Sequence, residues 1–188
     1  LIDFGLRWLA DHLNLKALPA SPPETFRSYF EAGRYQRSKD YLRISTHFGW
    51  LAEATQLAAI LFFWFAGGFP ILDSWVRSFG KGPILSGLIF VGILMGLRSI
   101  LSFPFSLYST FVIEENFGFN RTSWRTFIID RIKGVVLGCF LGAPLLAGIL
   151  FFFRAAGPYA WLYSWGGVVG FMLIMQYIAP TWIMPWFN

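Results

Sequence analysis

The chain has 188 residues, of which 56% are hydrophobic, 20% aromatic and only 13% charged. Soluble domains carry about 25% charged residues, so this chain lacks the polar surface that a water-soluble globule of its size needs. This composition excludes a soluble enzyme, a disordered tail and a collagen-like rod. A single cysteine, Cys139, excludes a disulfide framework and a thiolate zinc cluster. The formal charge of +5 therefore indicates orientation in a membrane rather than binding to nucleic acid.

Residues 1–18 have the pattern of an amphipathic helix. Asp3, Arg7 and Asp11 recur every four residues, a spacing that allows ion pairs along one helix face. The segment is either the wet end of a first membrane helix, which we prefer, or a helix lying on the membrane surface. Because the chain starts with Leu1 and not with methionine, we expect it to begin inside a longer polypeptide.

A polar segment, residues 19–47, separates this helix from the membrane spans. It opens with a linker that contains proline and serine, and we expect a helix from Glu24 to Thr46. We predict that the whole segment is a cytoplasmic loop.

Four stretches are long and apolar enough to cross a bilayer, whose core needs about 20 residues of helix. They are residues 48–72, 83–103, 134–153 and 161–179. Runs such as 61–65 are apolar on both faces, which excludes the alternation of barrel strands. Pro104 is expected to break or kink the second span, and Pro180 to end the fourth. The predicted fold is all-α: a polytopic transmembrane helical bundle with four full spans and a partial first span.

Two charged residues lie within or beside these spans. Arg98 is a cation inside the second span, and Glu53 lies near the start of the first. Charges inside a membrane are costly and often functional. Each residue either lines an aqueous chamber or sits at an interface, which we prefer; Arg98 would then snorkel toward the boundary near Pro104.

Basic residues are distributed unequally between alternate loops. Residues 16–47 and the loop at 104–133 together hold ten basic residues, against three in the other loops. The positive-inside rule places the ten, and the end of the chain, on the cytoplasmic side. Of the membranes that allow this orientation, we favour the bacterial inner membrane, with the endoplasmic reticulum membrane as the alternative.

The predicted loop at 104–133 contains the most informative stretch. Gly118 lies within Asn-Phe-Gly-Phe-Asn, which suits a tight turn with positive φ. Thr122 or Ser123 can cap the helix that follows. Glu114 and Glu115 are either an acid–base pair, a brace for a further domain or, as we prefer, polar anchors at a helix end.

Residues 106–120, Ser-Leu-Tyr-Ser-Thr-Phe-Val-Ile-Glu-Glu-Asn-Phe-Gly-Phe-Asn, closely resemble the signature of type I CAAX prenyl proteases. These are integral-membrane zinc metallopeptidases. Residues 30–36, Phe-Glu-Ala-Gly-Arg-Tyr-Gln, resemble the first cytoplasmic loop of that family. Residues 177–188 resemble the stretch that leaves the membrane just before its protease domain. The three matches fall in family order across nearly the whole chain.

The resemblance implies seven membrane helices around a water-filled chamber, and removal of the last three residues of prenylated CAAX proteins. It also implies zinc held by two histidines of a His-Glu-x-x-His helix and a later glutamate. The two histidines here, His12 and His47, do not form that motif. We therefore expect no catalytic residue, no metal ligand and no cofactor in this chain, which should be inactive alone, and zinc in the full-length protein.

The sequence thus predicts the N-terminal membrane part of a CAAX-type zinc metalloendopeptidase, which forms chamber wall and seats the protease domain. Expected partners are the lipid bilayer, the chain's own C-terminal protease domain and prenylated or membrane protein substrates, but no nucleic acid. The residues expected to brace or seat that domain are Glu114, Glu115, Asn116, Phe117, Gly118, Phe119 and Asn120. The alternative is a stand-alone, non-catalytic membrane scaffold or, less favoured, a small transporter.

Overall fold

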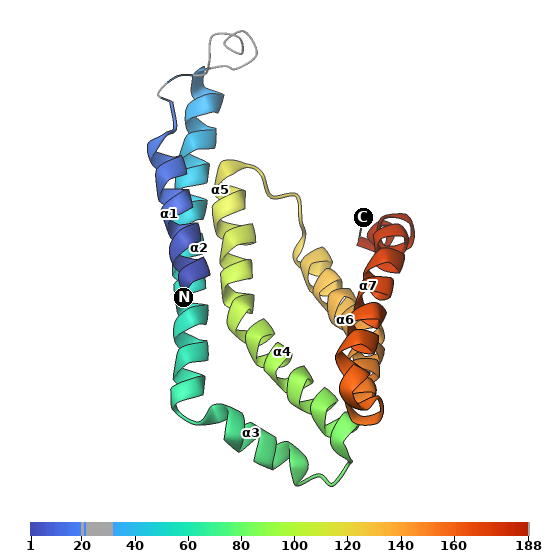
Figure 1. Ribbon diagram of the computed structural model, residues 1–188. Helices are drawn as coiled ribbons and strands as arrows, with labels where there is room; N and C mark the ends of the chain where they lie inside the picture. The colour runs from blue at the N-terminus through green and yellow to red at the C-terminus, as the bar shows by residue number, and fades with distance from the viewer. Residues whose placement is uncertain (20, 22–31, 188) are drawn as a thin grey trace. The chain divides into compact units, whose positions relative to one another are not determined.

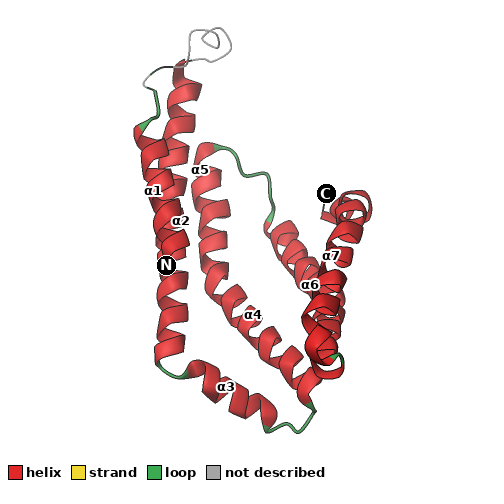
Figure 2. Ribbon diagram, in the orientation of Figure 1, coloured by secondary structure: helices red, strands yellow, loops and turns green. Residues whose placement is uncertain are grey.

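The computed structural model describes residues 1–19, 21 and 32–187, and this part of the chain is helical without strands (Figures 1 and 2). The main helices are α1 (Ile2–Lys16), α2 (Ala32–Phe65), α3 (Gly68–Arg77), α4 (Pro83–Tyr108), α5 (Glu115–Phe117), α6 (Trp124–Ala155) and α7 (Ala160–Ile178). The described residues also form two π-helices, η2 (Ser109–Glu114) and η4 (Ala179–Ile183). They form two 3₁₀ helices as well, η3 (Gly157–Tyr159) and η5 (Met184–Phe187). Residues 22–31, which include the start of the predicted 24–46 helix and of the 30–36 motif, lie outside the described residues.

Four helical stretches are long and apolar enough to cross a membrane, as predicted. They are Gly33–Phe65, Pro83–Phe117, Trp124–Ala155 and Gly157–Phe187. Their most apolar windows are not buried inside the protein. Each stretch has more than 30 residues, which is longer than the roughly 20 that an untilted span of a bilayer core needs.

The first predicted span, 48–72, ends too late. The helix α2 stops at Phe65, and Gly67 follows with a φ of 73°, a left-handed conformation that favours glycine. The chain then turns into the short helix α3. The prediction used Asp73 as its boundary and missed the earlier glycine break.

Within the segment predicted as the loop 104–133, the helix after Ser123 is present as predicted, but residues 104–117 are helical and not a loop. Pro104 lies inside α4, and the helix continues through η2 and α5 to Phe117. Pro104 has no amide to donate to the carbonyl of Ile100, and membrane helices tolerate such a loss inside a helix. Similarly, Pro180 lies within η4, so the α-helical geometry ends at Ile178 but the helical path continues.

The chain forms two compact units. The first comprises Leu1–Gly68 and Gly96–Arg121, and the second comprises Phe69–Met95 and Thr122–Asn188.

In the first unit, α1 packs along α2 through aromatic rings. The centroids of Trp8 and Trp50 are 5.7 Å apart, and Trp50 Nε1 donates to Asp11 Oδ2 at 3.2 Å. The predicted ion pair within α1 is present, because Arg7 Nε lies 3.0 Å from Asp3 Oδ2. Aromatic contacts also join α2 to α4, where Phe48 meets Phe105 and Tyr108.

In the second unit, α6 and α7 form an antiparallel pair, and α4 approaches α6 closely. Phe152 stacks on Tyr163 with ring centroids 5.8 Å apart. A Cβ added at Gly87 would lie only 2.7 Å from Cδ1 of Leu150, so the glycine allows the close approach. Small residues at helix contacts are typical of membrane bundles, because lipid supplies no hydrophobic drive for packing.

Candidate functional site

The segment Glu114–Asn120, here called the signature turn, ends the long α4–η2–α5 helix with a regular cap. Gly118 has a φ of 74°, as the sequence predicted. The amide of Phe119 donates to the carbonyl of Glu114 at 2.8 Å, and that of Gly118 donates to the carbonyl of Glu115 at 3.0 Å. These two bonds are the Schellman pattern, which satisfies carbonyls that a helix end would otherwise leave unpaired.

A π-helix, η2, leads into this turn and was not predicted from the sequence. It covers residues Ser109–Glu114, which lie inside the 106–120 stretch, and it buries Ile113. A π-helix inserts extra backbone into a helix and so changes which side chains share a face, and such insertions are common at functional sites. Composition and periodicity carry no signal for it, because its residues are ordinary helix residues.

The helix α2 holds the signature turn from the side. Arg37 Nη2 donates to the carbonyl of Asn116 at 3.3 Å. The Tyr41 ring makes edge contacts with Phe117 and Phe119, with centroids 5.5 and 4.8 Å apart. The residues directly after the 30–36 motif therefore contact the 106–120 stretch, which brings two of the three family-like segments together.

The two glutamates of the turn have different surroundings. Glu115 is exposed, and its Oε2 accepts a hydrogen bond from Nδ2 of Asn120 at 2.9 Å, which closes the turn across its open side. Glu114 is half-buried, and its backbone carbonyl accepts both Phe119 and Asn120 amides. Glu115 therefore contributes a side-chain bond that closes the turn.

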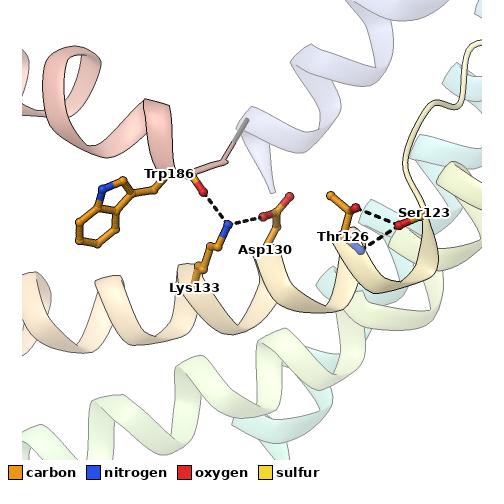
Figure 3. Close-up of polar contacts among 5 residues, drawn as sticks. All are labelled: Ser123, Thr126, Asp130, Lys133 and Trp186. Carbon is orange, nitrogen blue, oxygen red and sulfur yellow. Dashed lines mark hydrogen bonds and ion pairs between the residues drawn. The ribbon is translucent and has the colours of Figure 1, made fainter.

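The helix α6 begins directly after the turn with a side-chain cap. The hydroxyl of Ser123 accepts a hydrogen bond from the amide of Thr126 at 3.1 Å, and the two hydroxyls lie 2.9 Å apart (Figure 3). Of the two residues predicted to cap this helix, the cap is therefore Ser123. Only residues 118–123 separate α5 from α6.

Arg98 and Glu53, the charged residues of the spans, differ in their position relative to the contact between α2 and α4. Arg98 is exposed and precedes Phe105 by seven residues, or about two helical turns, so it lies on the face of α4 that contacts α2. Glu53 is also exposed and follows Phe48 by five residues. That spacing places Glu53 about 140° around α2 from the face that contacts α4.

The described residues contain no group of three histidine, cysteine, aspartate or glutamate side chains that could hold a metal ion. His12 stacks on Trp8 and His47 meets the edge of Trp50, with centroids 5.6 and 4.9 Å apart. Each histidine thus packs against a tryptophan of its own helix, and these two tryptophans contact each other between α1 and α2.

An all-helical chain with four membrane-crossing stretches is a polytopic membrane domain. A sequence model of the family described as "CAAX prenyl protease N-terminal, five membrane helices" matches residues 11–188. The chain therefore belongs to this family, and it corresponds to the N-terminal membrane part of the relatives that it matches. The family's five membrane helices agree with four full spans and a partial first one.

Named relatives support this assignment. The chain is 34% identical to a CAAX prenyl protease 1 homolog of Arabidopsis thaliana over 94% of this chain and 44% of the relative. A homolog of Oryza sativa subsp. japonica is 33% identical over 88% of this chain and 41% of the relative. The crystal structure of S. mikatae Ste24p shares the fold, with a TM-score of 0.85 and 24% identity, over 100% of this chain and 45% of that chain. The chain thus spans less than half the length of these proteins.

Replacing Tyr41 with leucine should loosen the signature turn. Each aromatic pair contributes about 0.5–1.5 kcal/mol, so losing two should raise the open population of the turn by about tenfold. Trypsin cleavage after Arg121, followed by mass spectrometry on detergent-solubilised protein, should accelerate by a similar factor. Tyr159→Leu, at a ring that is 64% exposed, is the matched control and should leave the rate unchanged. Equal rates for the two variants would contradict this role for Tyr41.

Proposed function

We propose that this chain forms part of the wall of a water-filled chamber and seats the zinc protease domain of a metalloendopeptidase that removes the C-terminal tripeptide of prenylated proteins. The observation that carries the proposal is the signature turn, which α2 holds at the end of a membrane helix. A rigid polar turn at that place offers a following domain a defined surface. The family membership supplies the reaction class.

The physical logic of this architecture is containment. A prenylated substrate has an apolar lipid and a polar peptide, and these need different surroundings. Helices with unburied apolar windows can face lipid on one side and enclose water on the other. When bound, zinc would polarise the scissile carbonyl and activate water, while its ligands would come from sequence beyond this chain.

The full-length protein provides the direct test of this proposal. Its reading frame should continue into a His-Glu-x-x-His helix and a later glutamate, and the purified protein should hold about one zinc ion. It should release a tripeptide from a farnesylated CAAX peptide, and a chelator should abolish that release. A frame without the motif, or a zinc-free protein without cleavage, would instead favour a stand-alone scaffold. Uptake of a solute without proteolysis would favour the transporter alternative.

The chamber proposal gives Arg98 a role as a lining residue. Arg98 lies about 22 Å along the helix from Pro83, so a bilayer core about 30 Å thick that starts near Pro83 would contain it. A cation there costs about 2.5–3.5 kcal/mol when it faces lipid, so an aqueous space would relieve that cost. Arg98 lies on the same face of α4 as Phe105, which contacts α2, and this position supports the lining role. Glu53 remains a second candidate, but its position away from that face gives it less support.

Cysteine labelling distinguishes a chamber from a lipid-facing surface. Leu101 precedes Phe105 by four residues and shares its face, whereas Ile100 is turned away and is 72% exposed. In a Cys139→Ser background, Leu101→Cys should react with a water-soluble methanethiosulfonate and Ile100→Cys should not. If Arg98 merely snorkels from a lipid-filled surface, both cysteines should stay unreactive.

We further propose that the signature turn, the residues before α2 and the end of η5 are cytoplasmic. The excess of basic residues on that side supports this orientation. It is the same in a bacterial inner membrane and in the endoplasmic reticulum membrane, because both present a cytoplasmic face. The plant relatives support the endoplasmic reticulum membrane over the bacterial one favoured from the sequence.

Sidedness can be measured in closed vesicles with an impermeant maleimide. In the same cysteine-free background, Arg121→Cys should label only from the cytoplasmic side, and Lys81→Cys only from the opposite side. Lys81 lies in the short connection between α3 and α4, across one span from the signature turn. The reverse labelling pattern would contradict the orientation.

A further inference from the structure

Lys133 of α6 makes three contacts around the last described turn of the chain. Its Nζ donates to the backbone carbonyl of Trp186 at 2.5 Å and lies 3.3 Å from Oδ1 of Asp130 (Figure 3). The same ammonium lies 5.6 Å from the centroid of the Phe187 ring. These contacts, here called the Lys133 clasp, join segments that are 53 residues apart and belong to one compact unit.

The chemistry of the clasp suits the end of a helix. The last carbonyls of a helix have no partner within it, and the helix dipole makes that end attractive to cations. A lysine ammonium is a compact charge with three donors, so it can serve a carbonyl and a carboxylate at once. Lys133 and Asp130 are both partly buried, with side chains 39% and 30% exposed, so water screens their contacts less than those of a surface pair.

The segment that the clasp holds has little regular structure to hold itself. After α7 the chain passes through the π-helix η4 and then the 3₁₀ helix η5. Pro180 and Pro185 lack amide donors, so each removes a possible backbone bond. Thr181 donates its hydroxyl to the carbonyl of Tyr177 at 2.8 Å, but this bond is local. The amide of Met184 donates to the carbonyl of Ala179, so η5 follows η4 directly, and the Lys133 clasp ties this segment to α6.

We propose that Lys133 is a positioning residue that sets the direction in which the polypeptide leaves α7. The clasp rests on the described contacts alone. Its consequence for catalysis rests on the proposed function, because a protease domain attached beyond Phe187 would inherit its placement from the clasp. Lys133 acts through the backbone of Trp186 and would touch neither substrate nor metal.

The experiment measures the position of the exit segment directly. In the full-length protein in nanodiscs, with Cys139 and any other cysteine replaced, spin labels are placed at Phe151→Cys and Met184→Cys. Phe151 lies 18 residues along α6 from Lys133, or about 27 Å, which suits pulsed electron paramagnetic resonance. Both labelled side chains are exposed, at 54% and 61%.

We expect one narrow distance distribution for the parent and for Lys133→Arg, which keeps the charge and the donors. Lys133→Met should broaden or shift it, with the ratio of docked to undocked segment falling by about tenfold or more. Arg125→Met, which removes a charge two turns earlier on the same helix, is the control and should match the parent. A narrow, unshifted distribution for Lys133→Met would overturn the proposal.

Peptidase kinetics separate this proposal from the proposed function. Lys133→Met should lower kcat with KM and zinc content near the parent values, and Lys133→Arg should restore kcat. If the parent protein binds no zinc and cleaves nothing, the proposed function fails while the distance measurement still decides the clasp. Should Lys133→Met fail to fold, Phe187→Leu removes only the ring contact. That variant should broaden the distribution to a smaller degree, and an unchanged distribution would overturn the proposal.

Discussion

The bilayer imposes the constraint on which the rest of this structure depends. In lipid, each backbone amide and carbonyl must find its partner within the protein, so the membrane-crossing parts form long helices. The four membrane-crossing stretches meet this demand because they are helical. Their most apolar windows are not buried inside the protein. Because lipid competes with side chains for apolar contact, the helices contact one another through a few rings and close approaches. Phe48 against Tyr108 and Gly87 against Leu150 are examples.

Specific chemistry is concentrated where the helices end. At the signature turn, a left-handed glycine, two backbone bonds and the Glu115–Asn120 contact replace the regular helix pattern. At the other end of the same connection, Ser123 caps α6, and Lys133 reaches the carbonyl of Trp186. Helix ends carry unpaired backbone groups, so they need side-chain partners. Those partners give these places a defined shape that a following domain could recognise.

Sequence reasoning succeeded where a single local rule decides the structure. Gly118 has positive φ because its neighbours demand a tight turn, and Ser123 caps because its hydroxyl can reach the amide of Thr126. It failed at helix boundaries. Charge positions located the apolar windows but not the helix ends: α2 stops at Phe65, before the predicted 72, because a left-handed glycine at Gly67 breaks it. Similarly, Pro104 suggested a break that a membrane helix does not require.

The sequence by itself determined the membrane class, the helical architecture, the family resemblance and the absence of a His-Glu-x-x-His motif from this chain. These depend on composition and on contiguous patterns, which need no knowledge of contacts. Only the tertiary structure decided that Arg37 and Tyr41 hold the signature turn and that Lys133 holds the segment at 184–187. It also revealed η2. Such contacts join residues dozens of positions apart, and their pairing depends on how helices pack, which no local pattern encodes.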